Sequence, residues 1–384
     1  MDKIAIGIMS GTSLDGIDIV ITKITGNKTN TKLKIIAFQT VAYEEKLLKR
    51  IKQSLNLETS SSELLCSLNF ELGYAYSAAV KKVCEENNVS LKEVAFIASH
   101  GQTIYHLGEA SNGNVKSSLQ LGEGAVIANL CETTVVSNFR AADIAVNGQG
   151  APLVPYFDYL LFTDETNNRV MNNIGGISNV TVLKKAGTAN DVFAFDTGPG
   201  NMMIDYACKK LFNLEYDNLG EIAKSGVIIK PLLEELLKHE YFKKTPPKST
   251  GREQFGDWYT EKILTNYTKF AKEDIITTLT YFTAFSIVEA YEKYIFPKLR
   301  VTEIIVSGGG AYNAFLLEIL KEQMPQVKII KLEDIGFNSG AKEALAFVVL
   351  ANETLNFNPA NLAKATGAEK EVILGQVNYY FKNN

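Results

Sequence analysis

One design, two apolar runs joined by a turn of small residues, occurs twice in this chain and constrains the fold more than any other feature. The first copy is IAIGIMSGTSLDGIDIV, residues 4–20, and the second is RVMNNIGGISNVTVL, residues 169–183. Each copy predicts a β-hairpin, because apolar runs of this length around a Gly-containing turn are typical of paired strands. Self-similarity within a chain indicates a repeated structural unit. We therefore expect two copies of one unit, each opened by a hairpin.

The segments after each hairpin alternate between strand and helix patterns. In the first half, helical periodicity covers residues 44–55, 62–87 and 123–131. Further strands are expected at residues 34–43, 94–98, 133–137, 192–195 and 303–306. Three strands in a meander, followed by alternating helices and strands, predict an α/β layer fold with an antiparallel edge on a partly parallel sheet.

Two irregular stretches interrupt this pattern. DIAVNGQGAP, residues 143–152, combines Asn, Gly and Pro, and we expect the boundary between the two units in its first part, residues 143–150. TPPKSTGREQFGD, residues 245–257, has two prolines and two glycines. We expect a loop there, which is either a solvated excursion or part of a substrate cleft.

Charge and composition exclude several classes of partner. The 384 residues carry a net charge of −4, with 46% hydrophobic and 21% charged residues, and lysines and arginines form no long run. This balance argues against nucleic acid or an anionic membrane surface as the main partner. The four cysteines match no metal or redox spacing, and no apolar stretch reaches the roughly 18 residues of a membrane span. We expect a soluble, cytoplasmic protein.

The turn of the first hairpin raises a question of charge. Its Gly, Ser and Thr residues offer bare backbone N–H groups and hydroxyls, which bind anions. Asp15 and Asp18 follow directly, although a carboxylate repels phosphate unless a cation lies between them. A Mg²⁺-bound nucleotide resolves this conflict, because the ion takes oxygen ligands from carboxylates and phosphates alike. A plain hairpin with solvated aspartates explains the same residues, and this stretch alone favours neither interpretation.

The strongest local signal for chemistry is FAFDTGPGN, residues 193–201. An apolar strand delivers Asp196 to a Thr-Gly-Pro-Gly turn, and a helix is expected to start near Asn201. Ligands of open α/β sheets bind at the carboxyl ends of strands, which suits Asp196 for the role of a general base or a Mg²⁺ ligand. The competing interpretation is an aspartate that caps a helix or turn, and the repeated Gly turns favour the functional role.

A third Gly-rich turn, SGGGAYN at residues 307–313, lies between a buried strand and a helix. Backbone there allows close approach to a flat or charged ligand, and the helix N-terminus favours an anion. Neither the P-loop pattern nor the G-x-G-x-x-G fingerprint occurs at this turn. A nucleotide would therefore be held by several Gly turns from the two units.

Three further polar positions each have two interpretations. His100 in SHGQT, residues 99–103, is expected to be a satisfied or substrate-contacting histidine and not a base, because no G-x-S-x-G elbow accompanies it. Arg140 would either bind a ligand carboxylate through two N–H groups or form an ion pair with Asp143. Glu343 would be a solvated glutamate in the first turn of a helix or a carboxylate in the cleft.

Taken together, seven motifs resemble the 1,6-anhydro-N-acetylmuramic acid kinase family, a part of the actin, sugar kinase and Hsp70 superfamily. They are GIMSGTSLDGIDI, SHGQT, NFRAADIAVNGQGAPLVP, NNIGGISNVT, FDTGPGN, SGGGAYN and GAKEALAF, in the family's order over nearly the whole chain. The resemblance implies a two-lobed actin-like ATPase (ASKHA) fold with duplicated RNase H-like domains and a central cleft. It also implies that the C-terminal segment returns to the first lobe. Residues 1–143 with about 358–384 would then form lobe I, and residues 144–357 lobe II.

The resemblance further implies an ATP-dependent enzyme of peptidoglycan recycling. It would open the 1,6-anhydro bond of 1,6-anhydro-N-acetylmuramic acid with water and phosphorylate the freed 6-hydroxyl, giving N-acetylmuramic acid 6-phosphate and ADP. Asp196 matches the family's base, which activates the water. Thr103 and Glu343 are expected in the sugar site, and Arg140 is a candidate partner for the substrate carboxylate.

The cofactors implied are ATP and Mg²⁺. Gly308–Gly310 would lie against the adenosine, and Asp15 or Asp18 would hold the magnesium directly or through water. The expected nucleotide-binding residues are Gly11, Thr12, Ser13, Leu14, Asp15, Gly16, Ile17, Asp18, Gly175, Gly176, Gly308, Gly309 and Gly310. The family also implies a homodimer.

Two alternatives to this function stay open at the level of sequence. One is a kinase of the same fold for a different sugar or a small carboxylic acid, in which Asp196 would deprotonate a substrate hydroxyl and no water would be consumed. The other is a non-catalytic ATP-dependent clamp, for which no substrate-binding or polymer-specific segment is evident.

Overall fold

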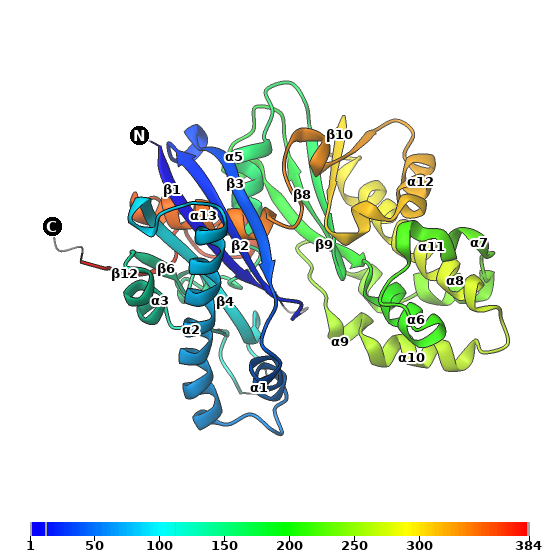
Figure 1. The fold of residues 1–384 in the computed structure, drawn as a ribbon. Helices are drawn as coiled ribbons and strands as arrows, with labels where there is room; N and C mark the ends of the chain where they lie inside the picture. Colours follow the sequence, from blue (N-terminus) through cyan, green and yellow to red (C-terminus); the bar gives the residue numbers. More distant parts are fainter. Residues whose placement is uncertain (1, 12–13, 112, 382–384) are drawn as a thin grey trace. The chain divides into compact units, whose positions relative to one another are not determined.

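Each of the two predicted hairpins opens a sheet of its own, and each sheet belongs to a separate unit. The computed structural model describes residues 2–11, 14–111 and 113–381. Unit 1 comprises Met1–Leu161 together with Gly340–Asn384, and unit 2 comprises Phe162–Ser339. Figure 1 shows the fold with its helices and strands labelled.

The sheet of unit 1 has the strand order β12-β6-β4-β1-β2-β3, with β5 paired to β4. Its strands are β1 (Lys3–Ser10), β2 (Ile17–Thr25), β3 (Lys32–Val41), β4 (Val94–Leu107), β5 (Ser117–Leu121), β6 (Val135–Ser137) and β12 (Gln376–Asn378). β1, β2 and β3 form the expected antiparallel meander. β4 runs parallel to β1, and β6 runs parallel to β4. The expected antiparallel edge on a partly parallel sheet is therefore confirmed.

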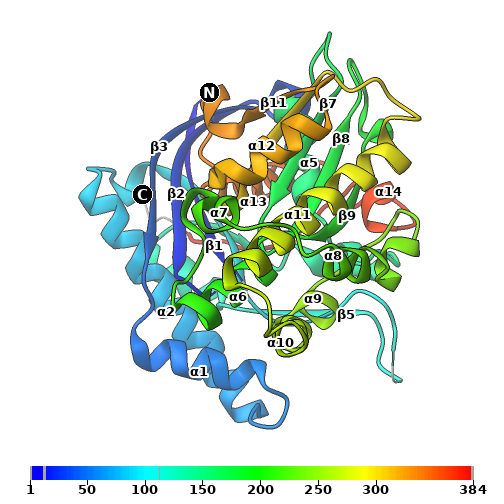
Figure 2. The same ribbon diagram turned by 90° about the vertical axis from the view of Figure 1, so that its right-hand side faces the viewer.

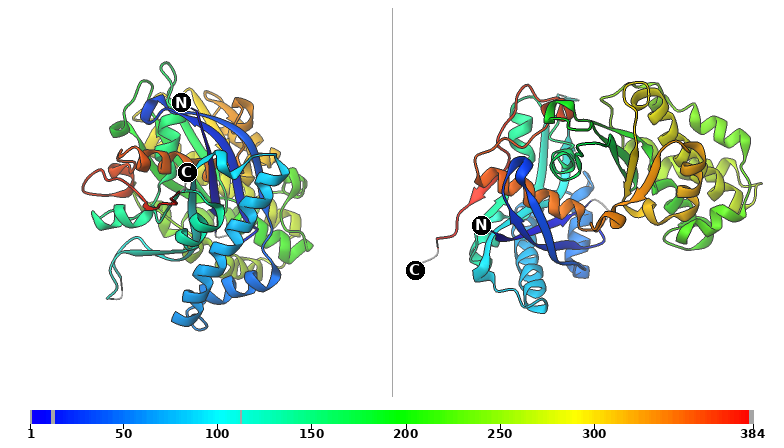
Figure 3. Two further views of the ribbon diagram at one scale, coloured as in Figure 1. Left: turned by 60° about the vertical axis from the view of Figure 1, so that its left-hand side comes forward. Right: turned by 90° about the horizontal axis from the view of Figure 1, so that it is seen from above.

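Both faces of this sheet are covered by helices. On one face, Ile6 and Ile8 of β1 join an apolar cluster with Leu68 and Leu72 of α2 (Ser62–Glu86), and α1 (Glu45–Leu55) and α3 (Gly124–Cys131) add to it. Alternate strand residues face opposite ways, so Gly7 points to the other face. There a Cβ at Gly7 would collide with the Ala344 carbonyl of α13 (Lys342–Leu355). Figure 3 shows this helix, in orange, alongside the blue strands.

The boundaries of the two units differ from those predicted. The turn-rich stretch at residues 143–150 lies within unit 1. Asp143 there is fully buried and accepts hydrogen bonds from Asn361 Nδ2 at 2.8 Å and Thr366 Oγ1 at 2.7 Å. The helices α5 (Val154–Phe162) and α13, which were expected in lobe II, belong to unit 1 apart from the last residue of α5. The C-terminal return to unit 1 thus begins at Gly340 and not near residue 358.

The sheet of unit 2 repeats the arrangement of the first, in the order β11-β10-β7-β8-β9. Its strands are β7 (Arg169–Ile174), β8 (Ile177–Leu183), β9 (Phe193–Pro199), β10 (Glu303–Ser307) and β11 (Lys328–Lys331). β7, β8 and β9 form an antiparallel meander, β10 runs parallel to β7, and β11 runs parallel to β10. These five strands have the same order and directions as β6-β4-β1-β2-β3 of unit 1, which confirms the duplicated α/β fold.

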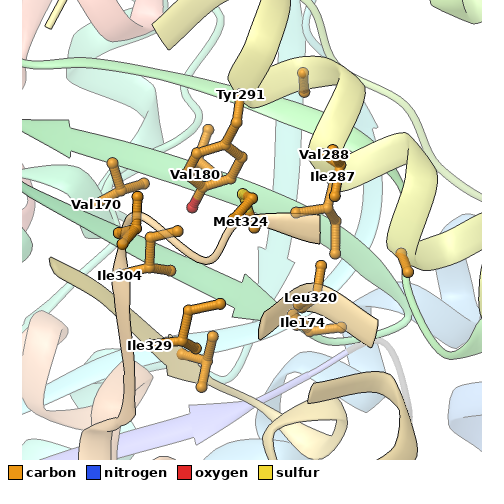
Figure 4. Close-up of a cluster of buried hydrophobic side chains, with 14 of the residues drawn as sticks. Val170, Ile174, Val180, Ile287, Val288, Tyr291, Ile304, Leu320, Met324 and Ile329 are labelled. Atoms are coloured by element: carbon orange, nitrogen blue, oxygen red, sulfur yellow. The ribbon is translucent and has the colours of Figure 1, made fainter. Parts of the chain in front are cut away.

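The helices of unit 2 form two apolar cores around α11 (Lys272–Ala290). One core lies between the sheet, the C-terminal half of α11 and α12 (Ala314–Gln323), and Figure 4 shows its side chains. The other packs the N-terminal half of α11 against the helices seen in Figure 2. These are α6 (Met202–Phe212), α7 (Glu221–Ser225), α8 (Lys230–Leu237), α9 (Arg252–Phe255) and α10 (Asp257–Asn266).

Several expected elements have different ends in the structure. The strand predicted at residues 94–98 continues to Leu107, because its second half pairs with β5, so SHGQT lies within β4 and not after it. β9 likewise extends to Pro199 and includes Asp196. Within the described ranges, no helix is both long and apolar enough to cross a membrane.

Candidate functional site

Two carboxylates lie where the turn between β1 and β2 leads into β2. Asp15 is exposed, and Asp18 is half-buried on β2, where its Oδ1 accepts a hydrogen bond of 2.5 Å from Thr40 Oγ1. Burial and the negative charge of Asp15 raise the pKa of Asp18, while the Thr40 hydrogen bond lowers it. A cation near these two carboxylates would offset their negative charges. No group of three or more His, Cys, Asp or Glu side chains among the described residues could hold a metal, so other oxygen ligands would have to complete this pair.

The remaining predicted residues of this turn have different environments. Thr12 and Ser13 lie outside the described residues. Ile17 is buried in the apolar core of unit 1, and Leu14 packs against that core with a φ of 61°. The side chains of Ile17 and Leu14 therefore pack in the core, and only the backbone groups of these two residues could contact a ligand.

The turn is tied to the SHGQT segment of β4 inside unit 1. Gln102 Nε2 donates to the Gly11 carbonyl at 3.2 Å, and Ser10 pairs with Gln102 in the parallel register of β1 and β4. The Ser10 hydroxyl is engaged with the hydroxyl of Tyr76 at 2.7 Å. The sequence singled out both motifs, and the structure brings them together.

In unit 2, the two Gly-rich turns meet at one end of the sheet. Gly175 and Gly176 form the turn between β7 and β8, and their carbonyl oxygens accept hydrogen bonds of 2.8 Å from Asn201 N and Gly200 N. Gly308 has a φ of +81°, and a Cβ there would lie 2.7 Å from the Ile174 carbonyl oxygen. The segment Gly308–Gly310 therefore needs glycine to lie directly against the end of β7, next to the Gly175 turn.

Asp196 lies on β9 with its carboxylate half-buried. Its Oδ2 accepts a hydrogen bond of 2.8 Å from Thr250 N, and no described residue donates to Oδ1. Burial raises the pKa of Asp196 to about 7, and the charge of Glu253 adds to the rise, while Thr250 N and Lys248 oppose it. A carboxyl group with a pKa near neutrality and one oxygen without a protein donor is suited to accept a proton.

The residues that surround Asp196 come from a segment to which the sequence assigned no specific role. Residues 245–250 run beside β9, and Asp196 N donates to the Lys248 carbonyl at 3.0 Å. The Tyr241 hydroxyl donates to the Asp196 carbonyl at 2.5 Å. The expected loop is thus not a solvated excursion in this part, because Lys248 is buried and its carbonyl is hydrogen-bonded to β9. The composition of the loop alone does not predict this contact.

Arg140, at the start of α4 (Arg140–Ala145), does not pair with Asp143, which was one of its two interpretations. Its guanidinium donates to the Gly150 carbonyl at 2.8 Å and to His100 Nε2 at 2.7 Å. Burial lowers the pKa of Arg140 to about 10, and it remains protonated at neutral pH. Burial and the charge of Arg140 hold the pKa of His100 well below its usual range, so His100 accepts this hydrogen bond as a neutral ring.

Glu343 and Thr103 also lie in unit 1. The Glu343 side chain is accessible to solvent on α13, yet desolvation by the surrounding protein raises its pKa. Arg140 and Lys342 oppose that rise, and Asp18 and Asp15 add to it. Thr103 is half-buried on β4, and its Oγ1 accepts a hydrogen bond of 3.3 Å from Gln120 Nε2. Glu343 therefore lies within electrostatic reach of both Arg140 and the aspartates of the first turn.

Comparison with known proteins gives consistent results. The family model described as anhydro-N-acetylmuramic acid kinase matches residues 3–380. The anhydro-N-acetylmuramic acid kinase of Francisella tularensis subsp. novicida (strain U112) is 54% identical over 378 residues, which covers 98% of this chain and 99% of that protein. The protein of the same name from Bacillus cereus (strain Q1) is 49% identical over 375 residues, or 97% of this chain and 98% of that protein.

Among solved structures, a similar one is component A of the (R)-2-hydroxyglutaryl-CoA dehydratase of Acidaminococcus fermentans. It has a TM-score of 0.46 and 13% identity, with 90% of this chain and 96% of that one covered. The family model and the two curated relatives span nearly the whole sequence, including all seven motifs. The chain therefore belongs to the anhydro-N-acetylmuramic acid kinase family, and it is an ATP-dependent kinase that phosphorylates a hydroxyl group.

Proposed function

We propose that Asp196 is the general base of a coupled hydrolysis and phosphorylation of 1,6-anhydro-N-acetylmuramic acid. The observation that carries this proposal is the half-buried carboxyl group of Asp196, whose pKa is raised to about 7 and whose Oδ1 has no donor among the described residues. At neutral pH roughly half of such groups are ionised, so the same carboxylate is able to take up a proton and release it again.

The reaction begins with a water molecule held by the Asp196 carboxylate. As the water oxygen bonds to the anomeric carbon, its proton passes to Asp196 and the bond between the anomeric carbon and O6 breaks. The freed O6 then attacks the γ-phosphorus of ATP, and the bond from the γ-phosphorus to the bridging oxygen breaks to release ADP. The products are N-acetylmuramic acid 6-phosphate and ADP, and the reaction serves peptidoglycan recycling. General-base catalysis of this kind contributes about 10²–10⁴ in rate.

The nucleotide would be bound by the Gly-rich turns. In this proposal, the backbone of residues 11–18 binds phosphate oxygens, and the turns at Gly175–Gly176 and Gly308–Gly310 take the remaining phosphate and the adenosine. Asp15 and Asp18 fit a magnesium ion, since a pair of carboxylates is a common protein contribution to Mg²⁺ when phosphates supply further ligands. When bound, the ion would offset the negative charge of the phosphates.

The sugar would be bound by polar groups of unit 1. Arg140 is held by His100 and the Gly150 carbonyl, which fixes the plane of its guanidinium for a bidentate hydrogen bond to the lactyl carboxylate. Glu343 and Thr103 would contact hydroxyl or amide groups of the sugar. We also propose a cytoplasmic location and a homodimer. Cell fractionation would test the location. The mass from light scattering, which equals that of two chains for a dimer and of one chain for a monomer, would test the oligomeric state.

The test of the base compares two aspartates of unit 2. Asp205 on α6 is matched to Asp196, because burial raises its pKa to about 7 as well. Asp196→Asn should lower the rate of ADP release with 1,6-anhydro-N-acetylmuramic acid by about 10²-fold or more, whereas Asp205→Asn should leave it within about twofold. Circular dichroism would confirm that both variants fold. An Asp196→Asn enzyme with nearly full activity would refute the proposal.

A further inference from the structure

A lysine beside Asp196 is buried without an ion pair. Lys248 is only 9% exposed, and none of the ion pairs between described residues includes it. Its Nζ lies 4.5 Å from the ring centre of Tyr241, 5.2 Å from that of Tyr294 and 6.0 Å from that of Phe242. Aromatic faces attract a cation, but they replace only part of the hydration that the ammonium loses on burial. Burial of this ammonium therefore costs free energy, and we infer that the charge has a function.

The charged groups around Lys248 do not neutralise it directly. Glu289 on α11 favours its protonated form, but Glu289 is already paired with Lys293. Lys293 and Lys244 oppose the protonated form, and Asp196 favours it. Asp196 is thus the one nearby carboxylate in this set that has no cation bound to it within the described residues.

Two chains of contacts connect Lys248 to Asp196. Through the backbone, the Lys248 carbonyl accepts the hydrogen bond of Asp196 N at 3.0 Å, and Thr250, two residues later, donates to the carboxylate. Through the side chains, Tyr241 offers its ring to the ammonium and its hydroxyl to the Asp196 carbonyl. The placement of the carboxylate therefore depends on the placement of Lys248.

We propose that Lys248 is a positioning residue for Asp196. The ammonium of Lys248, packed among the aromatic rings, holds residues 248–250 against β9. Its positive charge also stabilises the ionised carboxylate of Asp196. This inference rests on the proposed role of Asp196. The coupling is mutual, because each group favours the charged form of the other. Glu253 of α9 is the nearby charge that opposes ionisation of Asp196, and Lys248 acts against it.

The inference predicts a narrow pH optimum. Burial lowers the pKa of Lys248 to about 8 and raises that of Asp196 to about 7. The active form has Asp196 ionised and Lys248 protonated, so kcat/KM should rise through pH 7 and fall above pH 8. A bell-shaped profile of this kind reports the two groups of the free enzyme.

The test compares the pH profiles of kcat/KM for Lys248→Met, Lys248→Arg and Lys298→Met. Methionine keeps the apolar contacts with the aromatic rings and removes the charge, so the acid limb should move up by about half to one pH unit and the limb near pH 8 should vanish. Lys248→Arg keeps the charge and should keep the acid limb. Lys298, whose Nζ lies 5.5 Å from the Phe193 ring centre, is the matched control and should change neither limb. A uniform loss in Lys248→Met with both limbs in place would overturn the inference.

A second measurement does not depend on activity or on the folding of a Lys248 variant. The ¹⁵Nζ signal of Lys248 should titrate near pH 8 in the wild type and at lower pH in Asp196→Asn, because the aspartate charge is lost. An unchanged titration would refute the coupling. If Asp196→Asn instead keeps full activity, the role of Asp196 as base fails, and the two failures are thereby distinguished.

Discussion

The pH dependence of the reaction gives a quantitative test of Asp196. Its pKa is raised from 3.8 to about 7, because burial disfavours the charged carboxylate. A base must be ionised to accept a proton, so the active fraction should be about one half at pH 7, about one tenth at pH 6 and about one hundredth at pH 5. kcat/KM for the anhydro sugar should therefore fall about tenfold per pH unit in this range.

The assay should measure ADP directly, by chromatography of quenched samples, because coupling enzymes have pH profiles of their own. The stability of the enzyme over the assay time is checked by returning samples from pH 5 to pH 7.5. A profile that stays flat from pH 8 down to pH 5 would be expected of an aspartate with an ordinary pKa, and it would refute this account of the base.

The raised pKa of Asp196 also affects the free energy of unfolding, and here the protonated form is the favourable one. Because the folded state holds the proton of Asp196 more tightly than the unfolded state does, folding is favoured below the raised pKa and loses this contribution as pH rises from about 4 to about 7. Three pKa units correspond to about 4 kcal/mol, which is an upper limit for a half-buried group. Asp196→Asn should thus stabilise unit 2 at pH 8 and change its stability little at pH 4, as measured by urea unfolding at both pH values.

Three further substitutions test other parts of the account. Arg140→Ala should raise the KM for the sugar about tenfold or more, since it removes a charge-assisted hydrogen bond, and an unchanged KM would remove Arg140 from the sugar site. Asp18→Asn should raise the Mg²⁺ concentration for half-maximal ADP release by roughly tenfold or more, and an unaltered Mg²⁺ titration would count against the proposed ligand. Lys342→Met should destabilise unit 1 by about 3–5 kcal/mol, because it leaves Asp158, now 2.8 Å from Lys342 Nζ, buried without its ion pair. Adding Asp158→Leu should recover most of that loss in the same urea titration, whereas no recovery would show that the pair is not the cause.

The repeated hairpin was sufficient to predict the two sheets, because residues close in sequence determine a meander of strands. The parallel partners β4 and β10 also follow, since each contains an uninterrupted apolar run. The ends of the elements were less predictable. Beyond its apolar run, β4 carries His100 and Thr103, and its residues 102–107 pair with β5.

The division between the units was wrong for a similar reason. In the sequence, the Asn, Gly and Pro residues around Asp143 break the strand and helix pattern, as expected of a boundary between units. In the structure, Asp143 is buried and held by Asn361 and Thr366, which follow more than 200 residues later. A local pattern carries no information about partners at such a separation.

In the candidate site, residue type indicated which groups are candidates for chemistry but not what surrounds them. Asp196 stands out in its motif, whereas Lys248 and Thr250 lie in a Pro- and Gly-containing stretch with no regular pattern. Their relation to Asp196 depends on the two hydrogen bonds that join that stretch to Asp196. Similarly, the choice between two partners for Arg140 needed the position of His100, 40 residues earlier.

The most direct test of the central claim offers the purified protein 1,6-anhydro-N-acetylmuramic acid and plain N-acetylmuramic acid side by side, with Mg²⁺-ATP in ¹⁸O-water. The account predicts ADP release with the anhydro sugar and one ¹⁸O atom in the sugar phosphate, as measured by mass, with both lost in Asp196→Asn. Turnover of the open sugar alone, without label in the product, would contradict it and would assign Asp196 to the deprotonation of an ordinary hydroxyl group.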